Sequence, residues 1–81
     1  MTMRARVYVT LKREVLDPQG EAVKKGLVAL GVDGVRDVRV GKLIEIELDG
    51  EREAVRAKLD DAARKLLANL VIEDYRIELL D

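Results

Sequence analysis

The chain has 81 residues, of which 48% are hydrophobic and 38% are charged, and its formal net charge at pH 7 is −1. This length supplies a single domain, residues 1–81, and the even charge balance disfavours nucleic-acid and membrane partners. Because the sequence contains no His, Cys or Ser, it excludes Ser or Cys nucleophiles with a His base and metal sites built on thiolate or imidazole ligands.

The first predicted element is a strand from Ala5 to Leu11, in which apolar and polar side chains alternate. Tyr8 falls on the polar face, where RNA-binding sheets place a stacking aromatic. Such sheets carry several aromatics on a basic surface, and here one tyrosine lies among acidic neighbours. We therefore interpret this face as a solvated or interface surface and not as an RNA site.

A helix is predicted to begin in the stretch Leu16–Val23, LDPQGEAV. Free N–H groups at a helix start can hold a phosphate. Here Pro18 lacks an N–H, while Asp17 is a good N-cap whose charge would repel an anion. We therefore favour a capped helix start. The apolar spacing extends the helix to Leu30, and Gly31 suits the residue after its end.

Two further strands are predicted at Val35–Val40 and Leu43–Leu48, joined by a tight hairpin at Gly41-Lys42. A glycine–lysine pair can also contact phosphate, but nothing downstream completes a nucleotide-binding motif. A hairpin with a solvated charge is the favoured interpretation, and ligand contact stays open as the alternative.

The second half of the chain predicts a helix from Glu51 to about Ala68, with Asn69 as its stop, and a fourth strand over residues 74–79. The strings EAVKKGL at Glu21–Leu27 and EAVRAKL at Glu53–Leu59 suggest an internal duplication of two βαβ halves. The predicted fold is α+β: a ferredoxin-like, two-layer βαββαβ sandwich whose antiparallel sheet carries both helices on one face.

Three strings in order resemble the PurS family, the small subunit of phosphoribosylformylglycinamidine synthase. They are LDPQGEAV at Leu16–Val23, VRVGKLIEIEL at Val38–Leu48 and LLANLVIEDYRIEL at Leu66–Leu79. Each is unspecific alone, but the resemblance spans nearly the whole chain in the right order.

The resemblance implies a role in de novo purine synthesis, in the ATP-dependent step that converts an amide to an amidine with ammonia from glutamine. In that family the PurL subunit binds ATP and the ribonucleotide, and PurQ is the glutaminase. PurS acts as a homodimer that joins the two and supports ammonia transfer. The resemblance brings no catalytic, cofactor-binding or metal-binding residues to this chain.

An adaptor of this kind predicts a homodimer, with a higher oligomer left open, because a small core and open strand edges favour association. The competing hypothesis is a regulatory module that binds a small ligand, as ferredoxin-like ACT domains do. No apolar run in the sequence is long enough for a membrane span, and we expect a cytoplasmic protein. Loops often carry recognition. The candidate partner-interface residues are Asp17, Gln19, Gly20, Gly41 and Lys42.

Overall fold

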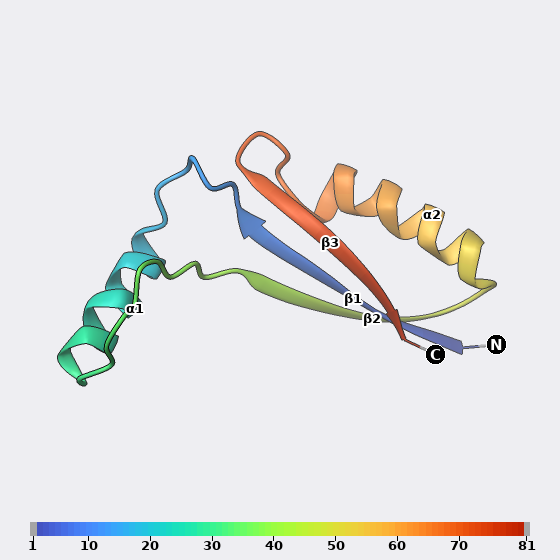
Figure 1. The fold of residues 1–81 in the computed structure, drawn as a ribbon. Coiled ribbons are helices and arrows are strands. Elements are labelled where there is room, and N and C mark those ends of the chain that lie inside the picture. The colour runs from blue at the N-terminus through green and yellow to red at the C-terminus, as the bar shows by residue number, and fades with distance from the viewer. Residues whose placement is uncertain (1, 81) are drawn as a thin grey trace.

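The computed structural model describes residues 2–80 as three strands and two helices. In chain order these are β1 (Thr2–Leu11), α1 (Pro18–Ala29), β2 (Lys42–Asp49), α2 (Arg52–Ala62) and β3 (Glu73–Leu80). The strands form one antiparallel sheet in the order β2-β1-β3 (Figure 1). The predicted α+β class, with an antiparallel sheet and two helices, is confirmed.

The core lies between the sheet and α2. Because β1 is the central strand and its side chains alternate, one face of it is buried: Met3, Ala5, Val7 and Val9. α2 and the turn after it place Val55, Leu59 and Ala63 against that face. Burial of this one apolar layer holds the two layers of the domain together.

The predicted strand at Val35–Val40 and the hairpin at Gly41-Lys42 are wrong. Residues 35–41 form no strand and lead directly into β2, so the sheet has three strands within the described chain. The N–H of Val40 donates to the carboxylate of Asp17 at 2.7 Å instead of joining a strand ladder. Gly41 is not among the glycines with positive φ, and a Cβ there would lie 2.5 Å from the carbonyl oxygen of Val9. Its glycine therefore permits close approach to β1 and does not form a turn.

α1 lies beyond one end of the sheet, at the opposite end of the molecule from the start of α2 (Figure 1). The domain is correspondingly elongated, with principal extents of 47 × 27 × 14 Å. Within one chain, the expectation that both helices cover one sheet face holds for α2 only. The cause is that the segments before and after α1 bind each other and carry the helix past the end of the sheet.

The end of α2 differs in detail from the prediction of one helix to about Ala68. Regular α-helix ends at Ala62 and a π-helical turn, Ala63–Leu67, follows, closed by a 2.9 Å bond from the N–H of Ala68 to the oxygen of Ala63. Asn69 then stops the helix as predicted. Its side-chain oxygen accepts from the N–H of Val71 at 3.2 Å, and its carbonyl accepts from Ile72.

Candidate partner interface

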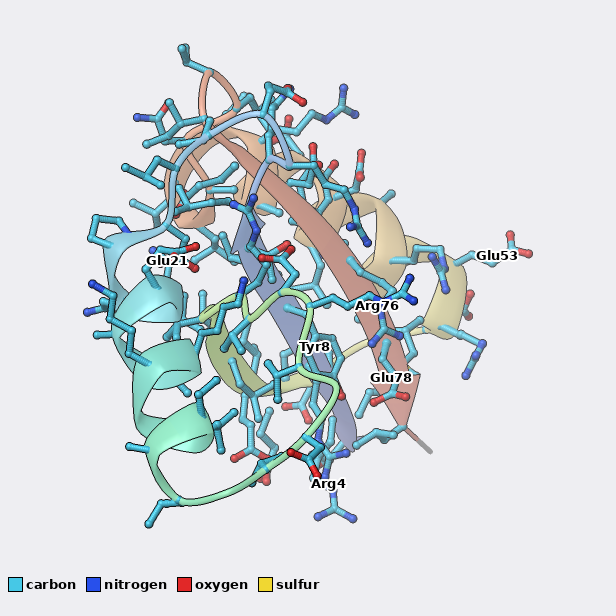
Figure 2. The ribbon with its side chains drawn as sticks, turned by 60° about the vertical axis from the view of Figure 1, so that its left-hand side comes forward. Arg4, Tyr8, Glu21, Glu53, Arg76 and Glu78 are labelled. Atoms are coloured by element: carbon cyan, nitrogen blue, oxygen red, sulfur yellow. The ribbon has the colours of Figure 1, made fainter. Side chains whose placement is uncertain are left out.

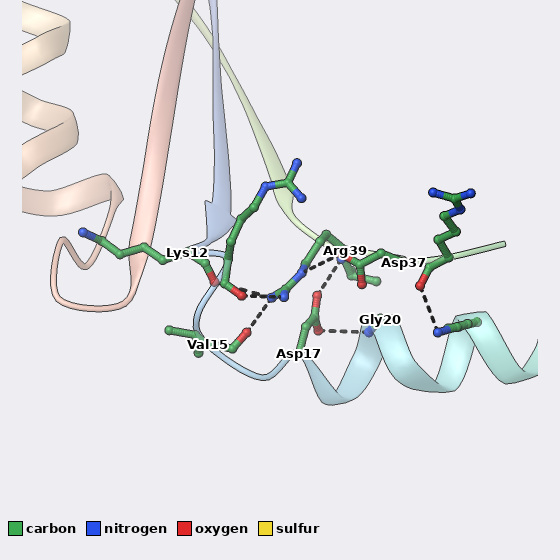
Figure 3. Close-up of polar contacts among 10 residues, drawn as sticks. Lys12, Val15, Asp17, Gly20, Asp37 and Arg39 are labelled. Carbon is green, nitrogen blue, oxygen red and sulfur yellow. Dashed lines mark hydrogen bonds and ion pairs between the residues drawn. The ribbon is translucent and has the colours of Figure 1, made fainter.

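Asp17 joins the start of α1 to the segment that precedes β2. Its side chain accepts one bond from the N–H of Gly20 at 2.9 Å, the predicted helix cap, and a second from the N–H of Val40 at 2.7 Å (Figure 3). The residue is only 5% exposed. The two N–H donors, helped by the nearby charge of Arg39, lower the pKa of the Asp17 carboxyl. An ionised carboxylate with both oxygens in use is a structural anchor.

Arg39 makes a second link between the same two segments. Its guanidinium donates to backbone carbonyl oxygens of the loop after β1: to Val15, to Arg13 at 2.8 Å and to Lys12 at 3.4 Å (Figure 3). It also pairs with Asp37 at 3.4 Å. The planar, fixed arrangement of its donors suits several acceptors at once. We call Asp17 and Arg39, with the backbone groups that they bind, the α1 anchor.

Gly20 allows the first turn of α1 to lie against the backbone of residues 38–40. A Cβ at this position would lie 2.0 Å from the carbonyl oxygen of Val38, a distance that no side chain tolerates. At the other end of α1, Gly31 has φ 85°. Its N–H bonds to Val28, and the N–H of Val32 bonds to Leu27, both at 3.0 Å. This is a Schellman motif, and the predicted helix end is confirmed.

All five residues proposed from the sequence lie at or beside the α1 anchor, in two groups. Asp17 and Gly20 are buried, with their polar groups used inside the chain. Gln19, Gly41 and Lys42 are exposed and line a shallow hollow of about 210 Å³. The rest of its lining is Val9, Leu11, Val40 and Glu73. Two separated stretches of sequence thus form one surface.

Sequence reasoning missed the apolar surface of α1, because it assigned that helix to the core of its own chain. Val23 is 44% exposed, Val28 59% and Leu30 82%. On the sheet, the apolar side chains of β2 are only half-buried: Ile44, Ile46 and Leu48. Nothing in the described chain packs at Gly26 of α1 either, where a Cβ would meet no atom within 4 Å.

The polar face of the sheet carries a paired network of charges. The hydroxyl of Tyr8 donates to Glu78 at 3.0 Å, and the guanidinium of Arg76 lies 4.3 Å from the centre of the Tyr8 ring (Figure 2). Arg6 pairs with Glu45 and with Glu78, each at 3.6 Å. Arg76 therefore covers the tyrosine ring on which a base would have to stack, and Glu45 and Glu78 neutralise Arg6.

Three further features of the described residues bear on function: another hollow, possible metal ligands and possible membrane-spanning helices. A hollow of about 580 Å³ beside α2 is lined by charged side chains together with Ala57 and Ile77. Among residues 2–80, no three His, Cys, Asp or Glu side chains gather where they could hold a metal ion. The same residues include no helix with the length and hydropathy needed to cross a membrane.

Comparison with known proteins identifies the family. A family model, PurS, phosphoribosylformylglycinamidine (FGAM) synthase, matches residues 4–81. The chain is 52% identical over 75 residues to the phosphoribosylformylglycinamidine synthase subunit PurS of Synechocystis, covering 91% of this chain and 75% of that protein.

Solved structures agree with the sequence comparison. PurS of Methanocaldococcus jannaschii, a subunit of formylglycinamide ribonucleotide amidotransferase, has a TM-score of 0.86 and 35% identity, covering 98% of this chain and 96% of that one. A chain in the structure of PurLQS from Thermotoga maritima has a TM-score of 0.89 and 28% identity, and covers 99% of each. The chain therefore belongs to the PurS family of phosphoribosylformylglycinamidine synthase subunits.

Proposed function

We propose that this chain is an assembly subunit of phosphoribosylformylglycinamidine synthase that joins a PurL synthetase to a PurQ glutaminase and supports ammonia transfer between them. The observation that carries the proposal is the match over 99% of the chain to a member of a PurLQS structure. That structure contains the relative together with L and Q subunits, and this chain has the same fold over its whole described length.

The side chains support a role without catalysis by the chain itself. The sequence holds no His, Cys or Ser, so a glutaminase reaction, which needs an activated nucleophile, has to come from a partner. At the α1 anchor, Asp17 and Arg39 bind backbone groups. On the sheet face, Arg6 pairs with Glu45 and Glu78. Such paired groups hold shape, and ATP chemistry falls to the synthetase subunit.

We also propose a homodimer in which α1 of each chain covers the sheet of the other. One chain carries two apolar surfaces that do not meet within it: the exposed residues of α1 and the half-buried side chains of β2. A two-fold axis would bring helix to sheet twice with one contact pattern. Both helices would then cover each sheet, one from each chain.

The loop residues proposed from the sequence remain the candidates for contact with PurL or PurQ. Gln19, Gly41 and Lys42 are exposed around one hollow, while Asp17 and Gly20 give that surface its shape. A rigid support with exposed polar groups is the usual setting for recognition.

Reconstitution tests the assembly role. PurL and PurQ homologues are assayed for glutamine-dependent formation of the amidine product with and without this chain, and again with an ammonium salt in place of glutamine. We expect omission of the chain to lower the glutamine-dependent rate at least tenfold and the ammonium-dependent rate much less. Equal glutamine-dependent rates with and without the chain would refute the proposal.

Size-exclusion chromatography with light scattering tests the dimer. We expect twice the chain mass at micromolar concentration, and a single-chain mass after Leu30→Asp or Val28→Asp on α1. Leu66→Asp, at a residue that is 80% exposed beyond α2, is the matched control and should leave the mass unchanged. A single-chain mass for the unaltered protein would contradict the dimer.

A further inference from the structure

α1 is connected to the rest of the molecule by two segments, residues 12–17 before it and residues 30–41 after it. Figure 1 shows the helix projecting from the sheet on these two connections. The sheet and α2 form a separate core, which holds no α1 side chain. The direction of α1 relative to the sheet is therefore set by contacts between the two segments themselves.

The α1 anchor supplies those contacts. Asp17 binds both the helix start and Val40, and Arg39 binds three backbone oxygens of the loop after β1. A further bond runs from Lys24 on α1 to the carbonyl oxygen of Arg36 at 2.9 Å. Every acceptor that Arg39 uses in the loop is a backbone oxygen. These bonds therefore fix the path of the backbone, and they do not depend on the side chains of the loop.

We propose that Arg39 is a positioning residue for assembly: its guanidinium, acting with Asp17, fixes the direction of α1 so that the helix is already placed to dock on the sheet of a second copy of the chain. Arg39 does not contribute to the core between the sheet and α2. Its side chain is 28% exposed and touches backbone oxygens and Asp37. Loss of its bonds leaves that core intact and widens the range of directions that the helix can take, because among residues 2–80 only the Asp17–Val40 bond and the bond from Lys24 then hold it.

The consequence for assembly rests on the proposed function. A helix held in its docking direction loses little conformational freedom when it binds, whereas a freely moving one must be ordered at that moment. Weakening the anchor should therefore weaken association without changing what the assembled complex does. Arginine suits this role better than lysine, because its fixed planar donors can serve several carbonyl oxygens together, while an ammonium is a point charge.

Single-molecule fluorescence energy transfer measures the direction of α1 directly. The sequence has no cysteine, so Lys25→Cys on α1 and Lys58→Cys on α2, both exposed, give two labelling sites. At picomolar concentration, where chains are separate, we expect one narrow efficiency peak for the unaltered protein and a clearly broader one for Arg39→Met. The matched control is Arg36→Met, at an exposed arginine three residues earlier, which should keep the narrow peak.

The same variants are then titrated in the reconstituted synthase. For Arg39→Met we expect the concentration of chain that gives half-maximal activity to rise at least tenfold while the maximal rate is unchanged, and Arg39→Lys to restore only part of the loss. Circular dichroism should show the helix content of the unaltered protein. A narrow peak for Arg39→Met, an unchanged half-maximal concentration, or a lowered maximal rate would each overturn the proposal.

These outcomes are distinct from a failure of the proposed function. If the unaltered chain gives no activation of PurL and PurQ, the assembly role is refuted and the fluorescence arm still decides whether Arg39 fixes α1. If the unaltered chain activates the synthase and Arg39→Met behaves identically at every concentration, the assembly role stands and the positioning role of Arg39 is refuted.

Discussion

Tyr75 on β3 donates its hydroxyl to the carboxylate of Asp60 on α2, and this bond joins the sheet to the helix layer. Arg64, one turn further along, pairs with the same carboxylate. The pKa of Asp60 is lowered, first by the Tyr75 hydroxyl and then by Arg64, and the bond raises the pKa of Tyr75 in turn. Polar groups thus link α2 to the sheet at the edge of the apolar layer.

Tyr75→Phe removes that hydroxyl and keeps the ring. Because a half-buried bond to a charged acceptor is lost, we expect the melting temperature to fall by about 5 °C. Tyr8→Phe is the matched control, since its hydroxyl binds Glu78 on the open face of the sheet, where Arg6 also serves Glu78. It should lower the melting temperature by less than half as much. Thermal unfolding followed by circular dichroism at one protein concentration compares them, and equal losses would contradict the assignment.

Acid should destabilise the protein through Asp17. Its folded pKa is lowered from the ordinary value of 3.8 by the N–H groups of Gly20 and Val40. A depressed pKa contributes stability that is complete above the unfolded value and is lost as the pH falls through the folded one. We therefore expect a nearly constant melting temperature from pH 7 to about 5, and a steep fall below pH 3.8.

Asp17→Asn tests this dependence, because asparagine also caps helices but does not titrate. Its melting temperature should be lower at pH 7 and should fall less steeply in acid than that of the unaltered protein. Asp61→Asn, at an exposed carboxylate paired with Lys65 at 3.1 Å, is the control and should keep the steep fall. An acid slope for Asp17→Asn equal to that of the unaltered protein would count against Asp17.

The same substitution at two glycines of α1 should have opposite effects. At Gly20 a Cβ would lie 2.0 Å from the oxygen of Val38, so Gly20→Ala forces the helix away from the segment 38–40, at a cost of roughly 2 kcal/mol of unfolding free energy. At Gly26 a Cβ meets nothing within 4 Å, and Gly26→Ala should stabilise the helix by about 0.5–1 kcal/mol. Urea titration measures both, and a gain for Gly20→Ala would refute the close approach.

Features of the fold that depend on near neighbours could be predicted from the sequence. Asp17 caps a helix whose first N–H groups are three residues away, and Gly31 ends it through bonds to the preceding turn. The alternation from Ala5 to Leu11 predicted a strand because one face of β1 is buried. For the helix cap and the helix end, the bonded groups lie within five residues of each other in the sequence.

Residues 35–40 could not be assigned in this way. Their alternation matches that of a strand, but whether the N–H of Val40 joins a ladder depends on Asp17, 23 residues earlier in the chain. The candidate site was likewise only half predictable. Lys42 was proposed from a predicted hairpin and lies exposed at the start of β2, whereas Arg39 was counted as one more polar residue of a strand. An amphipathic spacing in α1 indicates that the helix buries a face, but not which chain supplies the covering surface.

Lys42 provides the test of the proposed contact surface. It begins β2 beside Gly41 and lies exposed at the hollow that Gln19 also lines, so reversing its charge changes a surface and no buried contact. We expect Lys42→Glu to keep the melting temperature within about 2 °C, as exposed substitutions usually do, and to raise the half-maximal chain concentration in the synthase assay at least threefold. Lys58→Glu makes the same charge change on the exposed side of α2 and should leave that concentration unchanged. If both variants activate PurL and PurQ at the concentration that the unaltered chain needs, Lys42 does not contact either partner.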